Sequence, residues 1–190
     1  MTMTAALILG IAGVGLIYAV TLYNGLVQLK NNVAKAWANI DVLLKQRHDE
    51  LPKLIEVCKQ YKQFEQTTLT QVIAARNQVH EARAAQNVAA LGQAEDSLRG
   101  GLGKLFAVAE AYPELRANES FMQLQARITQ LENAIADRRE FYNDAVNLNN
   151  TRVEQFPDAV IAGLFRFGTQ PLLEFSSAEK ADVDVKALFA

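Results

Sequence analysis

The most constraining feature of the chain is an uncharged N-terminal run, since no charged side chain precedes Lys30. Residues 5–22 are apolar apart from isolated hydroxyl groups. As an α-helix this segment would be about 27 Å long, close to the ~30 Å hydrocarbon core of a bilayer. Tyr18 and Tyr23 lie near one end, where aromatic rings with polar tips favour the membrane interface. We therefore predict a transmembrane anchor over residues 1–25.

A cleaved signal peptide is the rival interpretation of this run, and the sequence does not favour it. It has no basic region ahead of the apolar segment, no small-x-small cleavage site at a suitable place and no nearby cysteine for a lipid. Lys30 and Lys35 follow the span, and no basic side chain precedes it. The positive-inside rule then predicts an external N-terminus and a cytoplasmic location for the bulk of the chain.

Composition favours a helical protein and excludes several classes. Half of the 190 residues are hydrophobic, and there are only 4 Pro and 10 Gly. Long spans without these residues favour helix. The net charge of −2 argues against a nucleic-acid partner, because phosphate binding requires a basic surface. A single cysteine, Cys58, excludes an internal disulfide framework and a thiolate metal cluster.

After the anchor, apolar residues recur at steps of three and four, the period of an amphipathic helix. The first stripe begins at Leu26 and reaches Pro52, where we predict a kink or a restart. A second helix is expected over residues 54–85. A third, over 91–108, contains Gly100 and its neighbouring glycine, which predict a bent or weakly stable helix.

A fourth helix is predicted from Phe121 to about Phe156, ended by Pro157, after a connection over residues 111–121. The predicted fold is therefore all-α: a transmembrane helix, an up-and-down four-helix bundle over residues 26–157 and an irregular C-terminal tail.

The tail, residues 158–190, mixes apolar clusters with loop residues. Such a segment can pack back onto the bundle, lie at the membrane interface or bind a partner. Its last stretch, DVDVKALF, can pair as a strand with another chain, although a disordered terminus is favoured.

No phosphate-binding glycine loop, H-E-x-x-H, G-x-S-x-G or paired-cysteine motif is present. Asp41 and His48 are seven residues apart and share a helix face, and Glu65 could complete a metal site across helices. We favour solvated or ion-paired side chains on the bundle surface instead. Cys58 lies on an apolar face and is interpreted as a small buried hydrophobe.

Amides are unusually frequent in the predicted helices, and they are indifferent helix formers. We expect them to form hydrogen bonds between helices that fix register. Arg138 and Arg139 could pair with Asp41 or Glu65 in the same way. The amides concerned are Asn24, Asn31, Asn32, Asn39, Asn143, Asn147, Asn149 and Asn150.

Several long motifs resemble one family. They are YNGLVQLKNNVAKAW, IDVLLKQRHDELPKLIEVCKQY, VIAAR, AYPELRANESFMQLQ, REFYNDAVNLNN and FPDAVIAGLFRF. They cover most of the chain and resemble the LemA family of bacterial membrane proteins. The resemblance implies a transmembrane helix, a four-helix bundle, a bacterial inner-membrane location and no established enzyme activity. Asn149 departs from the family pattern, in which tyrosine is common at this position.

The resemblance transfers structural or interaction candidates only. It implies no catalytic residue, no cofactor and no metal site. The candidates are Trp37, Asp41, Arg47, His48, Asp49, Pro52, Glu65, Arg76, Tyr142, Asn143, Phe156 and Pro157.

The leading hypothesis is a membrane-anchored, non-enzymatic interaction or scaffold protein that self-associates. Its expected partners are the lipid bilayer, further copies of the chain or another membrane protein. An accessory subunit of a transport or channel assembly is the alternative, although the span offers no ionisable residue to an ion path. A metal-dependent hydrolase using Asp41 and His48 is less favoured. Basic residues after the span could also bind anionic lipid: Lys30, Lys35, Lys45 and Arg47.

Overall fold

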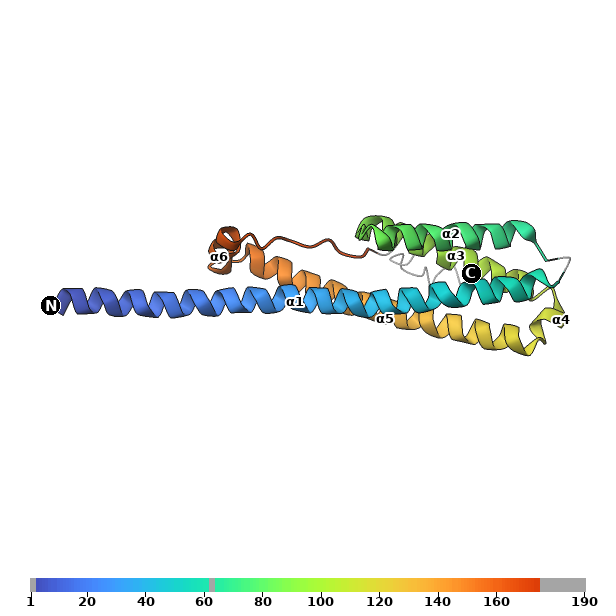
Figure 1. Ribbon diagram of the computed structural model, residues 1–190, viewed down its shortest axis with the longest axis horizontal. Coiled ribbons are helices and arrows are strands. Elements are labelled where there is room, and N and C mark those ends of the chain that lie inside the picture. Colours follow the sequence, from blue (N-terminus) through green and yellow to red (C-terminus); the bar gives the residue numbers. More distant parts are fainter. Residues whose placement is uncertain (1–2, 62–63, 175–190) are drawn as a thin grey trace, which may run out of the picture. The chain divides into compact units, whose positions relative to one another are not determined.

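The computed structural model describes residues 3–61 and 64–174 (Figure 1). These residues form helices and irregular segments and contain no strand, which confirms the all-α prediction. The helices are α1 (Met3–Lys59), α2 (Gln66–Ala84), α3 (Val88–Ala109), α4 (Pro113–Arg116), α5 (Glu119–Glu154) and α6 (Asp158–Phe165).

The chain divides into two compact units. Unit 1 contains the described residues up to Ile40 together with Arg138–Leu172. Unit 2 contains Asp41–Asp137 and the described residues from Leu173 onward. The long helices α1 and α5 each contribute residues to both units.

The restart predicted at Pro52 is wrong, because α1 continues through this residue to Lys59. An internal proline costs about 3 kcal/mol in a helix. Leu44, Leu51 and Leu54 continue the buried stripe in helical register on both sides of it. Their packing in unit 2 outweighs the local preference for a break. The predicted second helix is therefore divided, and only its later part forms the separate helix α2.

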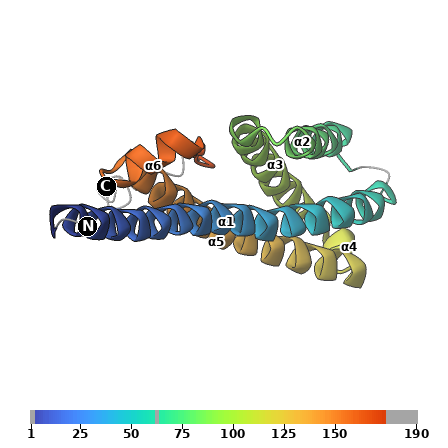
Figure 2. The same cartoon turned by 60° about the vertical axis from the view of Figure 1, so that its left-hand side comes forward.

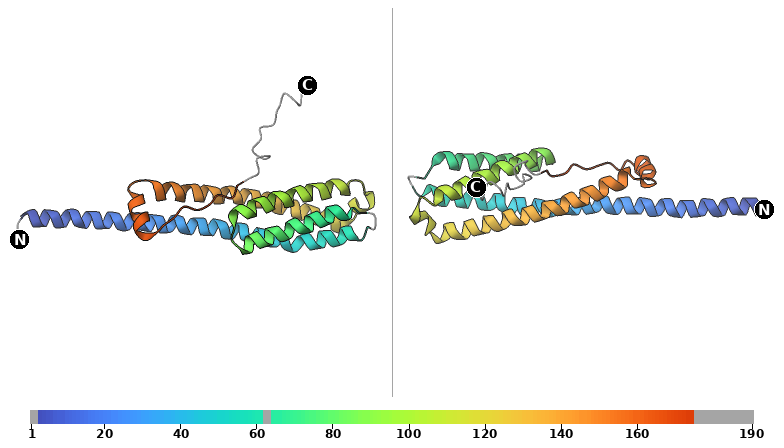
Figure 3. Two further views of the ribbon diagram at one scale, coloured as in Figure 1. Left: turned by 90° about the horizontal axis from the view of Figure 1, so that it is seen from above. Right: turned by 180° about the vertical axis from the view of Figure 1, so that it is seen from behind.

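Unit 2 draws its core from the last part of α1, from α2 and α3, and from the first part of α5. The two views in Figure 3 show α2 and α3 as neighbours. Between them Asn87 caps α3, because its side chain accepts a hydrogen bond from the Ala90 amide at 3.0 Å. Gly101 faces Val72, and a Cβ at this glycine would lie 3.4 Å from Val72 Cγ2. This glycine permits the close approach of the two helices.

The connection predicted over residues 111–121 is not entirely irregular, since it contains the one-turn helix α4. Pro113 occupies the first turn of α4. A proline is tolerated there because that position needs no backbone N–H donor. The residue expected to break structure thus begins a helix.

The prediction of an irregular tail is wrong for its first part, which forms α6. After α6, residues 166–172 run without helix or strand and are hydrogen-bonded to α5. Within unit 1, Figures 1 and 2 both show α6 beside α1. The segment DVDVKALF lies outside the described residues.

The N-terminal part of α1 is apolar, and its large side chains are exposed. Its best 18-residue window has a mean hydropathy of 2.3 and is 0% buried. Among the described residues, α1 is the one helix long and apolar enough to cross a membrane. The structure is therefore compatible with a single-pass anchor.

Candidate functional site

The most concentrated set of charges in unit 2 is a buried network contributed by three helices. Arg47 of α1 is 1% exposed and donates to carboxylate oxygens of Glu95 on α3 and Glu132 on α5. Arg99 Nε lies 3.7 Å from the second oxygen of Glu132. Two guanidinium groups thus face two carboxylates, so the charges of the network balance.

Arg47 reaches the core because it occupies a position of the apolar stripe. It lies three residues after Leu44 and four before Leu51, the spacing that places side chains on one helix face. Burial alone would lower the pKa of Arg47, but the charges and hydrogen bonds of Glu95 and Glu132 outweigh it and raise the pKa. Arg47 is consequently a fixed cation inside unit 2. Its position among the basic residues after the span suggested that it could bind lipid headgroups, but its burial prevents this.

A second row of polar contacts joins α1 to α2. Arg83 donates to both carboxylate oxygens of Asp41, at 2.9 Å for Nη2 to Oδ2. This hydrogen bonding lowers the pKa of Asp41. One heptad further along α1, Arg76 Nη2 lies 2.7 Å from His48 Nε2. The later residue of α1, His48, thus meets the earlier residue of α2, Arg76. This order shows that α1 and α2 are antiparallel in unit 2.

A second hydrogen bond of Arg76 explains how α1 accommodates Pro52. Proline has no N–H, so the carbonyl four residues earlier, that of His48, loses its helical donor. Arg76 Nε donates to this carbonyl oxygen at 3.1 Å. Arg76, His48 and Pro52, which all occur in the motifs that resemble the LemA family, are therefore linked in one structural role.

The surroundings of His48 lower the pKa of its ring and so disfavour the charged form. Burial is the first cause of its lowered pKa, and the charge of Arg76 and the nearby His80 add to it. The rings of His48 and His80 stack with centroids 4.8 Å apart. Because Nε2 faces a guanidinium donor, we assign the proton to Nδ1, which is buried and has no hydrogen-bond partner within the described residues. Within the part of the chain that the structure describes, no carboxylate accepts a hydrogen bond from this ring, so the ring lacks the group that orients a catalytic base.

The metal site considered for Asp41, His48 and Glu65 is not formed. Asp41 is bound by Arg83, and Glu65 is exposed and accepts a hydrogen bond from the Thr68 hydroxyl at 3.1 Å. In the part of the chain that the structure describes, no three His, Cys, Asp or Glu side chains are grouped to hold a metal ion.

The arginine that binds Asp41 is not one that the sequence suggested. Asp41 pairs with Arg83 of α2, whereas the guanidinium of Arg138 lies over the ring of Phe141 at 5.7 Å. Asp49, another candidate, is exposed on α1.

In unit 1, the candidates Trp37 and Tyr142 pack together, with ring centroids 5.6 Å apart. Burial raises the pKa of Tyr142, and its hydroxyl donates to the Pro171 carbonyl at 2.9 Å. Asn150 accepts from the Gln170 amide at 2.8 Å and donates to the carbonyl of the same residue at 2.9 Å. These groups therefore fasten Gln170 and Pro171 to α5.

The remaining candidates of unit 1 have different surroundings. Asn143 is half-buried on α5, Phe156 is 80% exposed and Pro157 precedes α6. Asn149 is buried and donates to the Gly168 carbonyl at 3.2 Å. The amides of α5 with these contacts thus bind an irregular segment, not another helix as predicted.

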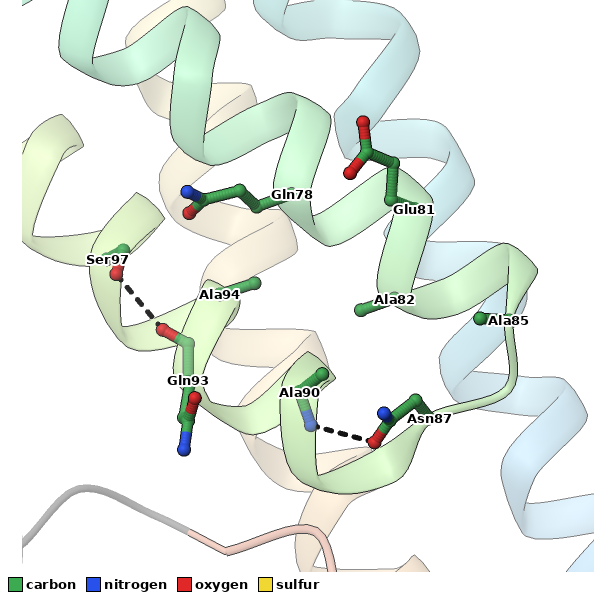
Figure 4. Close-up of a pocket in the computed structure, with 9 residues that line it drawn as sticks. All are labelled: Gln78, Glu81, Ala82, Ala85, Asn87, Ala90, Gln93, Ala94 and Ser97. Atoms are coloured by element: carbon green, nitrogen blue, oxygen red, sulfur yellow. Dashed lines mark hydrogen bonds between the residues drawn. The ribbon is translucent and has the colours of Figure 1, made fainter.

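A groove of about 480 Å³ lies between α2 and α3 in unit 2 (Figure 4). Alanine and amide side chains form most of its wall, including Gln78 and Gln93, and Glu81 is its one ionisable residue. Cys58 is buried elsewhere in unit 2, and burial raises its pKa to about 12. Neither feature assembles a nucleophile with a base.

Sequence reasoning missed Arg83, Glu95 and Glu132. Glu95 lies between Leu91 and Leu98 on the buried face of α3. A charged residue within an apolar stripe signals a buried ion pair, and opposite charges on two stripes would have indicated the partners. That signal was present for Arg47 and Glu95.

Comparison with known proteins identifies the family of this chain. The sequence profile of the LemA family matches residues 36–187. The chain belongs to the LemA family. Protein LemA of Metamycoplasma hominis is 26% identical over 166 residues, which cover 87% of this chain and 74% of that protein. The LemA match includes every residue of the buried network and begins after the apolar segment.

Two further relatives are similar over a shorter stretch. Magnetosome proteins MamQ 1 and MamQ 2 of Paramagnetospirillum magneticum are each 32% identical over 68 residues. These residues cover 36% of this chain and 25% of each relative. The similarity thus concerns about a quarter of the MamQ proteins.

Proposed function

We propose that this LemA-family protein is a single-pass, non-enzymatic scaffold of the bacterial inner membrane, with its helical units in the cytoplasm and unit 2 arranged as a four-helix bundle. The observation that carries the proposal is the N-terminal part of α1. Its large apolar side chains are exposed, and the same helix continues into the packed helical units without a break. A bilayer around this segment would remove those side chains from water.

The non-enzymatic part of the proposal is supported by the use that unit 2 makes of its polar groups. Arg47, Asp41 and His48 are all engaged by partners on neighbouring helices. Ion pairs and hydrogen bonds between neighbouring helices fix the register of those helices. These polar groups therefore hold the helices of unit 2 in register, and among the described residues they leave no reactive pair in an open cavity.

Self-association is supported by the exposed face of α5 in unit 1. Phe141 is 60% exposed and Leu148 is 55% exposed, one heptad apart. Phe141 borders a groove of about 280 Å³ whose wall includes Asn32 and Asn39 of α1. Apolar anchors beside amide donors and acceptors are suited to pairing with a second helical chain. We therefore propose that this face contacts another copy of the protein.

The experiment is to extract the full-length protein from its native membrane in mild detergent, measure the particle mass and identify what co-purifies. The proposal expects an oligomer, and Phe141→Ser should lower its mass. Met122→Ser is the matched control, since Met122 is also exposed on α5 and lies in unit 2. A strictly monomeric particle of 21.0 kDa protein that retains no other protein would refute the scaffold function.

A further inference from the structure

Helix α6 has an inverted distribution of side chains. Phe156 precedes it, and with Val160 and Leu164 it forms a face at steps of four residues; these side chains are 80%, 61% and 72% exposed. The one charged residue of α6, Asp158, points the other way and is buried. A surface helix of a water-soluble domain has the opposite pattern. The outer face of α6 thus suits an apolar surrounding.

The polar side of α6 is satisfied within unit 1. Arg152 of α5 donates to Asp158 Oδ1 from Nε at 3.1 Å and from Nη2 at 2.6 Å. This ion pair fixes which face of α6 meets α5. It therefore leaves the apolar face directed away from the protein.

The position of α6 along α1 indicates what its apolar face meets. Tyr23 contacts the ring of Phe165 with centroids 4.7 Å apart and the ring of Phe167 at 5.7 Å. Tyr23 directly follows the exposed apolar segment of α1. The C-terminal end of α6 therefore contacts α1 at the polar end of that segment, and Figure 2 shows α6 beside α1 in unit 1.

The groups around this junction are those of a membrane interface. Three aromatic rings, from Tyr23, Phe165 and Phe167, gather at one level of α1. Arg166 follows α6 with a left-handed backbone, φ 57°, and its side chain is exposed. Aromatic rings and a basic residue are enriched at the headgroup level.

We propose that α6 is an interfacial helix that embeds Phe156, Val160, Leu164 and Phe165 in the lipid bilayer where α1 leaves it. At eight residues, α6 is too short to cross the hydrocarbon core and therefore lies along its boundary. The proposal rests on the membrane anchor proposed above and adds a second site of lipid contact. It makes the bilayer, not a second protein, the occupant of this face.

The test uses full-length Cys58→Ala protein with one fluorescent label, reconstituted in vesicles of phosphatidylcholine and phosphatidylglycerol that carry nitroxide-labelled lipid. Labels are placed at Leu164→Cys on α6, at Val14→Cys in the apolar segment and at Glu140→Cys on the exposed side of α5. We expect lipid nitroxides to quench the labels at 164 and 14 and to leave the label at 140 unaffected. A shallow nitroxide should quench position 164 more than a deep one does.

Each other outcome overturns a defined part of the argument. If position 14 is quenched but 164 behaves like 140, the anchor stands and α6 is not interfacial. If position 164 is shielded from lipid and aqueous quenchers alike, protein covers α6 and the lipid proposal fails. If position 14 is not quenched, the anchor fails, and the interfacial helix with it. Val160→Cys, on the same exposed face, repeats the measurement should Leu164→Cys misfold.

Discussion

Arg47→Met gives the sharpest test of the buried network. The substitution removes the central guanidinium and keeps an apolar stem of similar length on the stripe. Glu95, whose side chain is 8% exposed, is then left buried without this partner. Glu132 is 16% exposed and still has Arg99 at 3.7 Å, so its loss is smaller.

The expected magnitude follows from this asymmetry. Breaking a buried ion pair from one side costs about 3–5 kcal/mol. Because only one of the two carboxylates loses its neutralising charge, we expect Arg47→Met to lower the free energy of unfolding by about 3 kcal/mol. Replacing both partners, as Arg47→Met with Glu95→Leu, should cost no more than about 1 kcal/mol, since no isolated charge is left in the core.

The assay is urea unfolding of the full-length protein in mild detergent, followed by far-ultraviolet circular dichroism. The matched control is Lys53→Met on the same helix, since Lys53 is 60% exposed and pairs with Glu50 on the surface. It should change stability by less than about 0.5 kcal/mol. The reasoning is refuted if Arg47→Met is as stable as the wild type, or if the double variant loses the sum of the two single losses.

Three further predictions concern individual side chains. The lowered pKa of His48 means that the unfolded chain binds the proton more readily than the folded protein does, so the contribution of His48 to stability is present above about pH 6.5 and is lost as the pH falls. His48→Gln, which keeps an acceptor, should therefore remove this part of the pH dependence of the melting temperature. An unchanged pH dependence would contradict the assignment. With a pKa of about 12 against an ordinary 9.0, Cys58 should hold about a thousandfold less thiolate and react with maleimide only in urea, whereas rapid labelling of the native protein would show that it is accessible. Asn150→Ala removes two hydrogen bonds to Gln170, worth about 1 kcal/mol each, and should speed proteolysis of that segment, whereas Asn147→Ala, on the exposed side of α5, should not.

The apolar periodicity was sufficient to predict helices, but not their ends. Pro52 illustrates the reason. A local rule disfavours helix before proline, yet the stripe continues through this residue and the carbonyl it frees has a donor on another helix. Such a donor becomes visible only when α2 is in place. Pro113 shows the opposite error. It was expected to end a helix but begins α4, because the sequence alone does not show where in a helix a proline lies.

The partners of the charged candidates were predictable only in part. The seven-residue spacing of Asp41 and His48 correctly indicated one face of α1. The sequence contains 19 basic side chains, and nothing local selects Arg83 for Asp41 over the other arginines. The register of α1 against α2 makes that choice, and register depends on packing over the whole of unit 2.

The tail shows a third limit of prediction from the sequence. The sequence shows the apolar clusters of the tail and allows a location at the membrane interface, but it predicts an irregular segment where the structure has α6. The helix is only eight residues long, and its mixture of alanine, glycine and bulky residues gives a weak local signal. Its buried face is fixed by the ion pair with Arg152, a contact that sequence reasoning did not identify.

The contact between Arg76 and the His48 carbonyl also makes one helix conditional on another. Until α2 docks, the middle of α1 carries a proline defect worth about 3 kcal/mol and an acceptor with no donor. A charged donor returns about 1.5–3 kcal/mol of this. In a newly synthesised chain, α1 would therefore fray around Pro52 and become continuous only when α2 arrives. Helical continuity through Pro52 thus reports that unit 2 has assembled.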